Sequence, residues 1–218
     1  MSISIATTLL SAALWQTLYM VLISGVIGCV LGIPLGMILF TTRKGGIIEH
    51  RHINTVLSTI TNIVRSIPFI ILLVAIIPFT RLIVGTSIGT NAAIVPLTIG
   101  TIPFIGRIVE NALEEVPYGL IEAALSMGAT PMQIMWNFLL PEAFPTIING
   151  LTVTSVLLVS YSAMAGAVGG GGLGDLGIRY GFQRFDISIM IATVVVLIVL
   201  VQLLQWLGDF VSRKLNKR

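Results

Sequence analysis

The segment that decides the fold is Glu122-Ala-Ala-Leu-Ser-Met-Gly128-Ala-Thr-Pro-Met-Gln-Ile-Met-Trp-Asn-Phe-Leu-Leu-Pro141, a polar-edged stretch between long apolar runs. Pro117 fits the first turn of a helix, and Gly128 fits a left-handed cap at its end. Thr130-Pro131 followed by Gln133 has the pattern of a capping box that opens a second helix. Residues of about 117–141 are therefore predicted to form two short helices joined by a sharp bend.

This predicted helix pair is a candidate contact surface for another protein. Ala123 and Ala124 give it a small-residue face, and Glu122 places a charge at the edge of that face. Such a protruding helix pair could bind in a groove of a partner protein. The alternative is an ordinary loop between two helices.

The composition indicates an integral membrane protein. The 218 residues are 56% hydrophobic and 10% charged, with a mean hydropathy of +1.02, whereas an average soluble domain has about 25% charged residues. The single Cys29 excludes an intramolecular disulfide and offers no metal cluster. The net charge of +3 comes from basic residues beside the apolar runs, so membrane topology explains it better than nucleic-acid binding.

Five apolar runs are long enough to cross a bilayer as helices, which takes roughly 20 residues each. They lie near residues 17–41, 57–79, 92–113, 145–167 and 187–210. We therefore expect an all-α, polytopic membrane protein, with residues 1–218 forming one transmembrane domain.

The basic residues predict the orientation, because cytoplasmic loops hold an excess of Lys and Arg. Arg43, Lys44 and Arg51 follow the first run, and the C-terminal tail carries Arg213, Lys214, Lys217 and Arg218. Both regions are expected in the cytoplasm, together with residues 117–141. Five spans then place the N-terminus outside.

Within the first run, small residues recur every fourth position at Ser24, Gly28, Gly32 and Gly36. Such a face allows a second helix to approach closely, so we interpret these residues as a helix-packing surface. Arg65 and Arg107 are charges inside predicted spans, which makes them functional candidates. Both lie toward the cytoplasmic side, however, and Glu110 is three residues from Arg107, so snorkelling and a local ion pair favour a structural role.

Several catalytic patterns fail their context or are missing. Gly169-Gly-Gly-Gly-Leu-Gly174 matches G-x-G-x-x-G, but no strand or βαβ unit surrounds it, so tight turns at the outer helix ends explain it better. The sequence has no G-x-x-x-x-G-K-[ST] phosphate loop. The chain is therefore not expected to be an enzyme, and any ATP hydrolysis would need a separate subunit.

The spacing of Glu122-Ala-Ala, Gly128 and the final Leu-Pro141 resembles the cytoplasmic coupling motif of permease subunits in binding-protein-dependent ABC importers. Phe138 stands where that family usually has isoleucine. The resemblance implies that Glu122, Ala123, Ala124, Gly128 and Pro141 couple the permease to its ATPase.

Further segments resemble the methionine importer permeases of that family. They are Val64–Leu73, Gly85–Gly89 and Tyr161–Gly169. The resemblance implies an inner-membrane homodimer on two ATP-binding subunits, which use ATP and Mg²⁺, while this chain binds no cofactor. It also implies an extracytoplasmic substrate-binding lipoprotein that delivers methionine, including D-methionine, and contact with membrane lipid but not with nucleic acid.

Met164 is a bulky side chain among small residues in Tyr161-Ser162-Ala-Met164-Ala-Gly-Ala. We expect Tyr161, Ser162 and Met164 to face the pathway and Met164 to close it, because an apolar constriction can bar solutes without a charge. The alternative is a gap-filling methionine in the core.

Three alternatives remain open from the sequence. One is an ABC permease for another amino acid or a small peptide. The second is an ion-coupled secondary transporter, against which five spans do not divide into equal repeats and no Asp or Glu lies centrally. The third is a membrane scaffold without transport. Dependence of uptake on a co-expressed ATPase separates an ABC permease from the secondary transporter and the scaffold.

Overall fold

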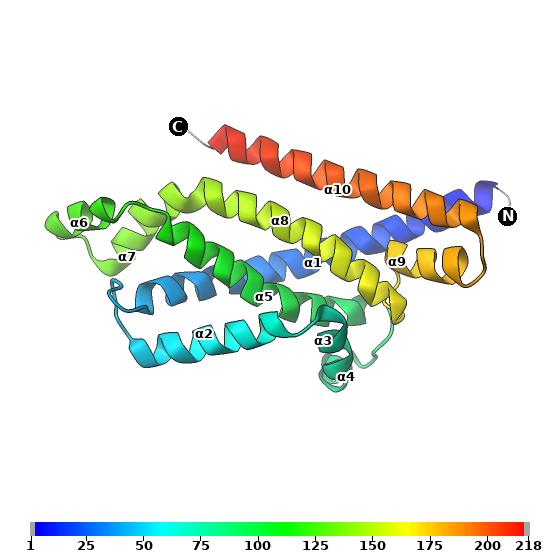
Figure 1. Cartoon of the computed structure of the whole chain (residues 1–218), viewed down its shortest axis with the longest axis horizontal. Helices are drawn as coiled ribbons and strands as arrows, with labels where there is room; N and C mark the ends of the chain where they lie inside the picture. The colour runs from blue at the N-terminus through cyan, green and yellow to red at the C-terminus, as the bar shows by residue number, and fades with distance from the viewer. Residues whose placement is uncertain (1–2, 216–218) are drawn as a thin grey trace. The chain divides into compact units, whose positions relative to one another are not determined.

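The computed structural model describes residues 3–215, and within that range the regular secondary structure is entirely helical (Figure 1). The predicted all-α fold is confirmed. The α-helices are α1 (Ile3–Thr42), α2 (Arg51–Ser66), α3 (Phe69–Ala75), α4 (Ile77–Val84), α5 (Thr90–Glu114), α6 (Tyr118–Ser126), α7 (Pro131–Gln133), α8 (Leu140–Ala167), α9 (Gly172–Leu176) and α10 (Ile187–Leu215). Two π-helical segments, η1 (Ile134–Leu139) and η2 (Gly177–Phe182), continue α7 and α9.

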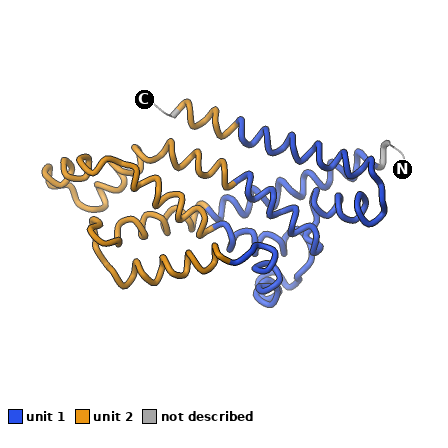
Figure 2. Tube along the Cα trace, in the orientation of Figure 1, with its two compact units in different colours: residues 1–28, 67–101, 155–206 blue, residues 29–66, 102–154, 207–218 orange. Residues whose placement is uncertain are grey.

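The chain divides into two compact units (Figure 2). Unit 1 holds residues 1–28, 67–101 and 155–206, and unit 2 holds residues 29–66, 102–154 and 207–218. Each of the four longest helices contributes one part to each unit.

Four helices in the described range are long and apolar enough to cross a membrane, and a bent pair makes up to five. The pair, Arg51–Ser66 with Phe69–Ala75, bends by 103° where one helix over 57–79 was predicted. Pro68 explains the break, because it has no N–H and disfavours the helical conformation at Ile67. Its φ of −55° and ψ of 131° lie outside the helical region.

In unit 2, the glycines of α1 allow a close approach to α5. A Cβ on Gly32 would lie 2.7 Å from Cβ of Ile105, and one on Gly36 would overlap the carbonyl of Gly106. Small residues are therefore required here for space. Ser24 and Gly28 lie in unit 1, where both are buried and Ser24 Oγ donates to the Met20 carbonyl at 2.5 Å.

The core of unit 2 holds α6 in place. Its buried apolar residues come from α1, α5, α6, η1 and α8, and α6 contributes Ile121 and Ala124. Leu120 packs against the same core. A helix of nine residues is marginal on its own, so this burial is what fixes α6 to the end of α5.

Candidate functional site

Helix α6 begins directly after Pro117. The φ of −56° and ψ of 129° at Pro117 are not helical, so this proline precedes the helix and does not occupy its predicted first turn. Pro117 instead belongs to the connection between α5 and α6, where its fixed φ sets the direction in which the chain enters α6.

Gly128 ends α6 as predicted, with a φ of +77°. Its N–H donates to the Leu125 carbonyl at 2.9 Å, and the Ala129 N–H donates to the Ala124 carbonyl at 3.0 Å. These two bonds are those of a Schellman motif, which requires a left-handed residue at this position. The sharp bend after α6 therefore depends on the backbone of Gly128.

The capping box at Thr130 is also confirmed. Thr130 Oγ1 accepts from the Gln133 N–H at 3.4 Å, and the Thr130 N–H donates to Gln133 Oε1 at 2.9 Å. The helix that it opens is not separate, however. Helix α7 passes through η1 into α8, so that Pro131–Ala167 forms one helical run of 37 residues. Of the two short helices predicted over residues 117–141, α6 alone is separate from its neighbours.

The structure separates the predicted contact residues into two groups. Glu122, Ala123, Gly128 and Pro141 are exposed. Ala124, in contrast, is fully buried and packs α6 on the core of unit 2.

Large apolar side chains that were not predicted as site residues are exposed on the same segment as Glu122. We define the tip surface as the exposed side chains of Tyr118, Glu122, Leu125, Met127, Met132 and Trp136. Met127 and Met132 are 69% and 66% exposed, and Trp136 Nε1 lies 3.0 Å from the Met132 sulfur. Large apolar side chains exposed close together in the chain make this surface a candidate interaction site. The signal in the sequence was the pair of methionines beside Gly128.

Next to α6, in unit 2, lies an open cavity of about 730 Å³. Phe138, Phe144 and Leu120 form apolar walls, and Glu115 and Glu142 place carboxylates on its lining. Thr146 Oγ1 donates to Glu115 Oε2 at 3.4 Å. The surface at this end of unit 2 is therefore both apolar and acidic.

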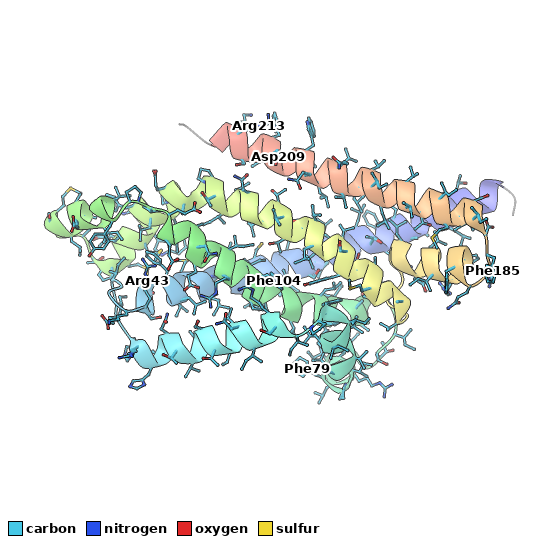
Figure 3. The ribbon with its side chains drawn as sticks, in the orientation of Figure 1. Arg43, Phe79, Phe104, Phe185, Asp209 and Arg213 are labelled. Carbon is cyan, nitrogen blue, oxygen red and sulfur yellow. The ribbon has the colours of Figure 1, made fainter. Side chains whose placement is uncertain are left out.

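The loop after α1 meets the end of α5 through charges. Arg43 forms an ion pair with Glu114 and lies over the Phe40 ring at 4.3 Å (Figure 3). Deeper in unit 2, Arg107 pairs with Glu110 at 2.6 Å, as the sequence predicted. Arg107 Nη2 also donates to Ser58 Oγ and Asn62 Oδ1, at 3.0 and 2.9 Å. Arg107 therefore ties α5 to α2.

In unit 1, the glycine run turns tightly and binds to α1. Gly169, Gly171 and Gly172 have φ values of +90°, +80° and +78°. The Gly172 N–H donates to Gln16 Oε1 at 2.8 Å, and the Leu173 N–H donates to Thr17 Oγ1 at 2.9 Å. Asp175 and Arg179 lie in the helical run of α9 and η2 that follows, and these two residues form an ion pair.

The three predicted pathway residues differ in their surroundings. Met164 is 45% exposed and lines an apolar cavity of about 670 Å³ in unit 1, so it is not a core residue of this chain. Tyr161 is half-buried and stacks on Phe69, with ring centroids 4.2 Å apart. Ser162 is 1% exposed, and its side chain donates to the Val159 carbonyl of its own helix at 2.7 Å.

Known proteins are similar to this chain over most of its length. The sequence profile described as "Binding-protein-dependent transport system inner membrane component" matches residues 32–217. The probable D-methionine transport system permease protein MetI of Vibrio cholerae is 64% identical over 210 residues, covering 96% of this chain and 93% of that protein. The D-methionine transport system permease protein MetI of Escherichia coli K12 is 59% identical over 158 residues, covering 72% and 73%.

Solved structures are similar over the same length. A chain of the MetNI methionine ABC transporter in an inward-facing conformation has a TM-score of 0.97 and 53% identity, covering 100% of both chains. A chain of an amino acid ABC transporter with histidines has a TM-score of 0.80, covering 95% and 94%. At 20% identity, the second likeness concerns the fold alone.

Proposed function

The chain belongs to the family of binding-protein-dependent transport system inner membrane components, and we propose that it is the inner-membrane permease subunit of an ATP-driven importer of methionine, including D-methionine. The observation that carries this function is the 64% identity to a probable D-methionine permease across nearly the whole of both chains. The TM-score of 0.97 to a methionine ABC transporter chain supports it.

The proposed partner of the tip surface is a separate ATP-binding subunit, which uses ATP and Mg²⁺. This chain has no phosphate loop of its own. Met127, Met132 and Leu125 offer apolar contact area, and methionine side chains adapt to a partner's shape. The Schellman motif at Gly128 and the capping box at Thr130 hold these side chains in fixed positions.

The proposed orientation places the tip surface in the cytoplasm and the N-terminus outside. Arg43, Lys44 and Arg51 support it, as do Arg213 and Lys214 at the end of α10. Lys217 and Arg218, which were part of the same prediction, lie outside the described residues.

We further propose a homodimer whose two copies enclose the pathway, two ATP-binding subunits, and a substrate-binding lipoprotein on the outer side. Up to five spans are few for a complete pathway in one chain, and a two-fold assembly is the commonest closed arrangement of one subunit. Met164 is the proposed outer gate, because its exposed side chain lies beside an apolar cavity.

The test of this function is uptake of labelled methionine by proteoliposomes with and without the ATP-binding subunit and its lipoprotein. We expect uptake that requires ATP and the ATPase. Uptake driven by an ion gradient without the ATPase would instead indicate a secondary transporter, and uptake of a different amino acid would change the substrate.

A substitution at Met132 tests the tip surface separately. Met132→Asp should weaken binding of the ATPase at least tenfold, because a carboxylate would be buried in an apolar contact. Met132→Leu keeps the contact apolar and should bind normally. Equal binding by both variants would move the partner away from this surface.

A further inference from the structure

Helix α2 presents polar groups to its own chain. Asn54 Nδ2 donates to the Leu39 carbonyl at 2.7 Å and lies 3.2 Å from Thr42 Oγ1. Thr61 is 2% exposed, and Ser58 accepts from Arg107 at 3.0 Å. The side of α2 that packs within unit 2 therefore carries hydrogen-bonded polar groups beside the half-buried Leu57 and Val64, unlike the apolar inner face of an ordinary amphipathic helix.

A row of apolar side chains on α2 is exposed. Ile53, Val56, Ile60 and Ile63 are between 44% and 57% exposed. Their spacing of three, four and three residues places them along one side of the helix. In a membrane protein, a continuous apolar stripe of this kind suits lipid or another apolar helix.

A second exposed row on α2 is polar. We call Thr55, Thr59, Asn62 and Ser66 the hydroxyl stripe, and all four residues are exposed. With 3.6 residues per turn, this row lies roughly 100° around the helix from the apolar row. Beside its end, Arg65 is also exposed, with its guanidinium 5.1 Å from the centre of the Phe104 ring.

Lipid is an unsuitable neighbour for this row. Thr55 and Ser66 donate back to the carbonyls of Arg51 and Asn62, at 2.9 and 2.8 Å, which satisfies the two protons but not the oxygen acceptors. Asn62 receives Arg107 on its oxygen, while its amide group has two N–H donors. Charged and amide groups within membrane spans face water or protein and rarely face lipid.

We propose that the hydroxyl stripe of α2 lines the water-filled cytoplasmic part of the translocation pathway, while the Ile53–Ile63 row lies against apolar surroundings. The inference rests on the proposed function and adds residues that neither the sequence motif nor the comparisons assign. Hydroxyl and amide groups along the stripe can donate to the carboxylate and accept from the ammonium of a passing amino acid. Arg65 adds a positive charge at one end of the stripe.

The test uses the accessibility of single cysteines, for which this chain is well suited because Cys29 is its only cysteine. In a Cys29→Ala background, cysteines replace Thr59 and Ser66 of the hydroxyl stripe. Ile60 and Ile63 of the apolar row provide matched controls on the same turns. The whole transporter with its ATPase is reconstituted, and a quaternary-ammonium methanethiosulfonate is added on both sides of the membrane.

The charged reagent needs a thiolate in water, so the Thr59→Cys and Ser66→Cys variants should react at least tenfold faster than the Ile60→Cys and Ile63→Cys variants. Modification of Thr59→Cys should also block uptake. Equal rates for the two rows, or faster reaction of the isoleucine positions, would overturn the inference. Two positions in each row keep the comparison valid if one variant fails to assemble.

Uptake by the Cys29→Ala transporter is measured in the same vesicles, and it distinguishes a failure of the proposed function from a failure of the role proposed for the hydroxyl stripe. ATP-dependent methionine uptake with uniform labelling would leave the proposed function standing and overturn the role of the stripe. Absence of uptake would contradict the proposed function, and the labelling rates would still show whether the stripe faces water.

Discussion

Gly128 in unit 2 and Gly174 in unit 1 are both required by the backbone, but for opposite reasons. At Gly128 nothing lies within 4 Å of an added Cβ, while its φ of +77° is one that side chains disfavour. At Gly174 an added Cβ would overlap the Ala163 backbone, including its carbonyl carbon at 2.7 Å. One glycine is needed for conformation and the other for space. Substitutions that change only the backbone preference, or only the side-chain size, can therefore distinguish the two requirements.

Gly174→Ala should give the largest loss of stability. The overlap is with main chain, which cannot move aside as a flexible side chain would, so we expect a destabilisation of about 3 kcal/mol or failure to assemble. The melting temperature of the detergent-solubilised transporter is the measurement. Gly119→Ala is the control, because nothing lies within 4 Å of its Cβ and the residue lies in α6. Equal melting of both variants would contradict the packing at Gly174.

Gly128→Val should have the next largest effect, mainly on binding of the ATPase. A left-handed backbone costs roughly 1–2 kcal/mol for a residue with a side chain, and more for a β-branched one. Gly128→Asn should bind nearly normally, because asparagine tolerates this conformation and the site has room. If asparagine is as harmful as valine in a pull-down with the ATPase, space and not conformation limits the position.

Thr130→Ala should be milder. It removes the oxygen that accepts from the Gln133 N–H, and loss of such a cap costs about 1 kcal/mol. Hydrogen exchange of the Gln133 amide should become faster, whereas Thr130→Ser should retain protection. Unchanged exchange in the alanine variant would mean that the capping box does not hold the start of α7.

Met164→Ala should have the smallest effect on stability and a selective effect on closure. Its side chain is already 45% exposed, so truncation removes little buried area. We expect normal assembly and ATP hydrolysis, but leakage of a small trapped solute from proteoliposomes, while Met164→Leu remains tight. A tight alanine variant would place the gate elsewhere, and a misfolded one would support a packing role.

The need for glycine at position 128, which is conformational, was predictable from the sequence. The need for glycine at position 174, which is steric, was not. Gly128 and the Thr130–Gln133 box follow local rules, since each needs only its neighbours in the chain. The burial of Ala124 and Ser162 depends on residues distant in sequence, and so do the close contacts of Gly174. The break at Pro68 had a local signal, but the apolar run around it favoured one continuous span.

The candidate site divides in the same way. The coupling motif located the tip surface, whereas the fusion of α7 with α8 was missed because a capping box marks where a helix begins and says nothing about where it ends. The exposed Met127 and Met132 were also missed, since exposure follows from which residues of α6 and η1 pack on the core.

The polar inner side of α2 has a consequence for the biogenesis of the protein. A segment with arginines at positions 51 and 65 and many hydroxyl and amide groups is a poor substrate for insertion into the bilayer by itself. Asn54 donates a hydrogen bond to α1, and Asn62 accepts one from Arg107 of α5. Lipid chains cannot form these hydrogen bonds. Helix α2 should therefore be retained at the translocon until α5 has been synthesised, and a ribosome-bound chain that stops before α5 should leave it outside the hydrocarbon core.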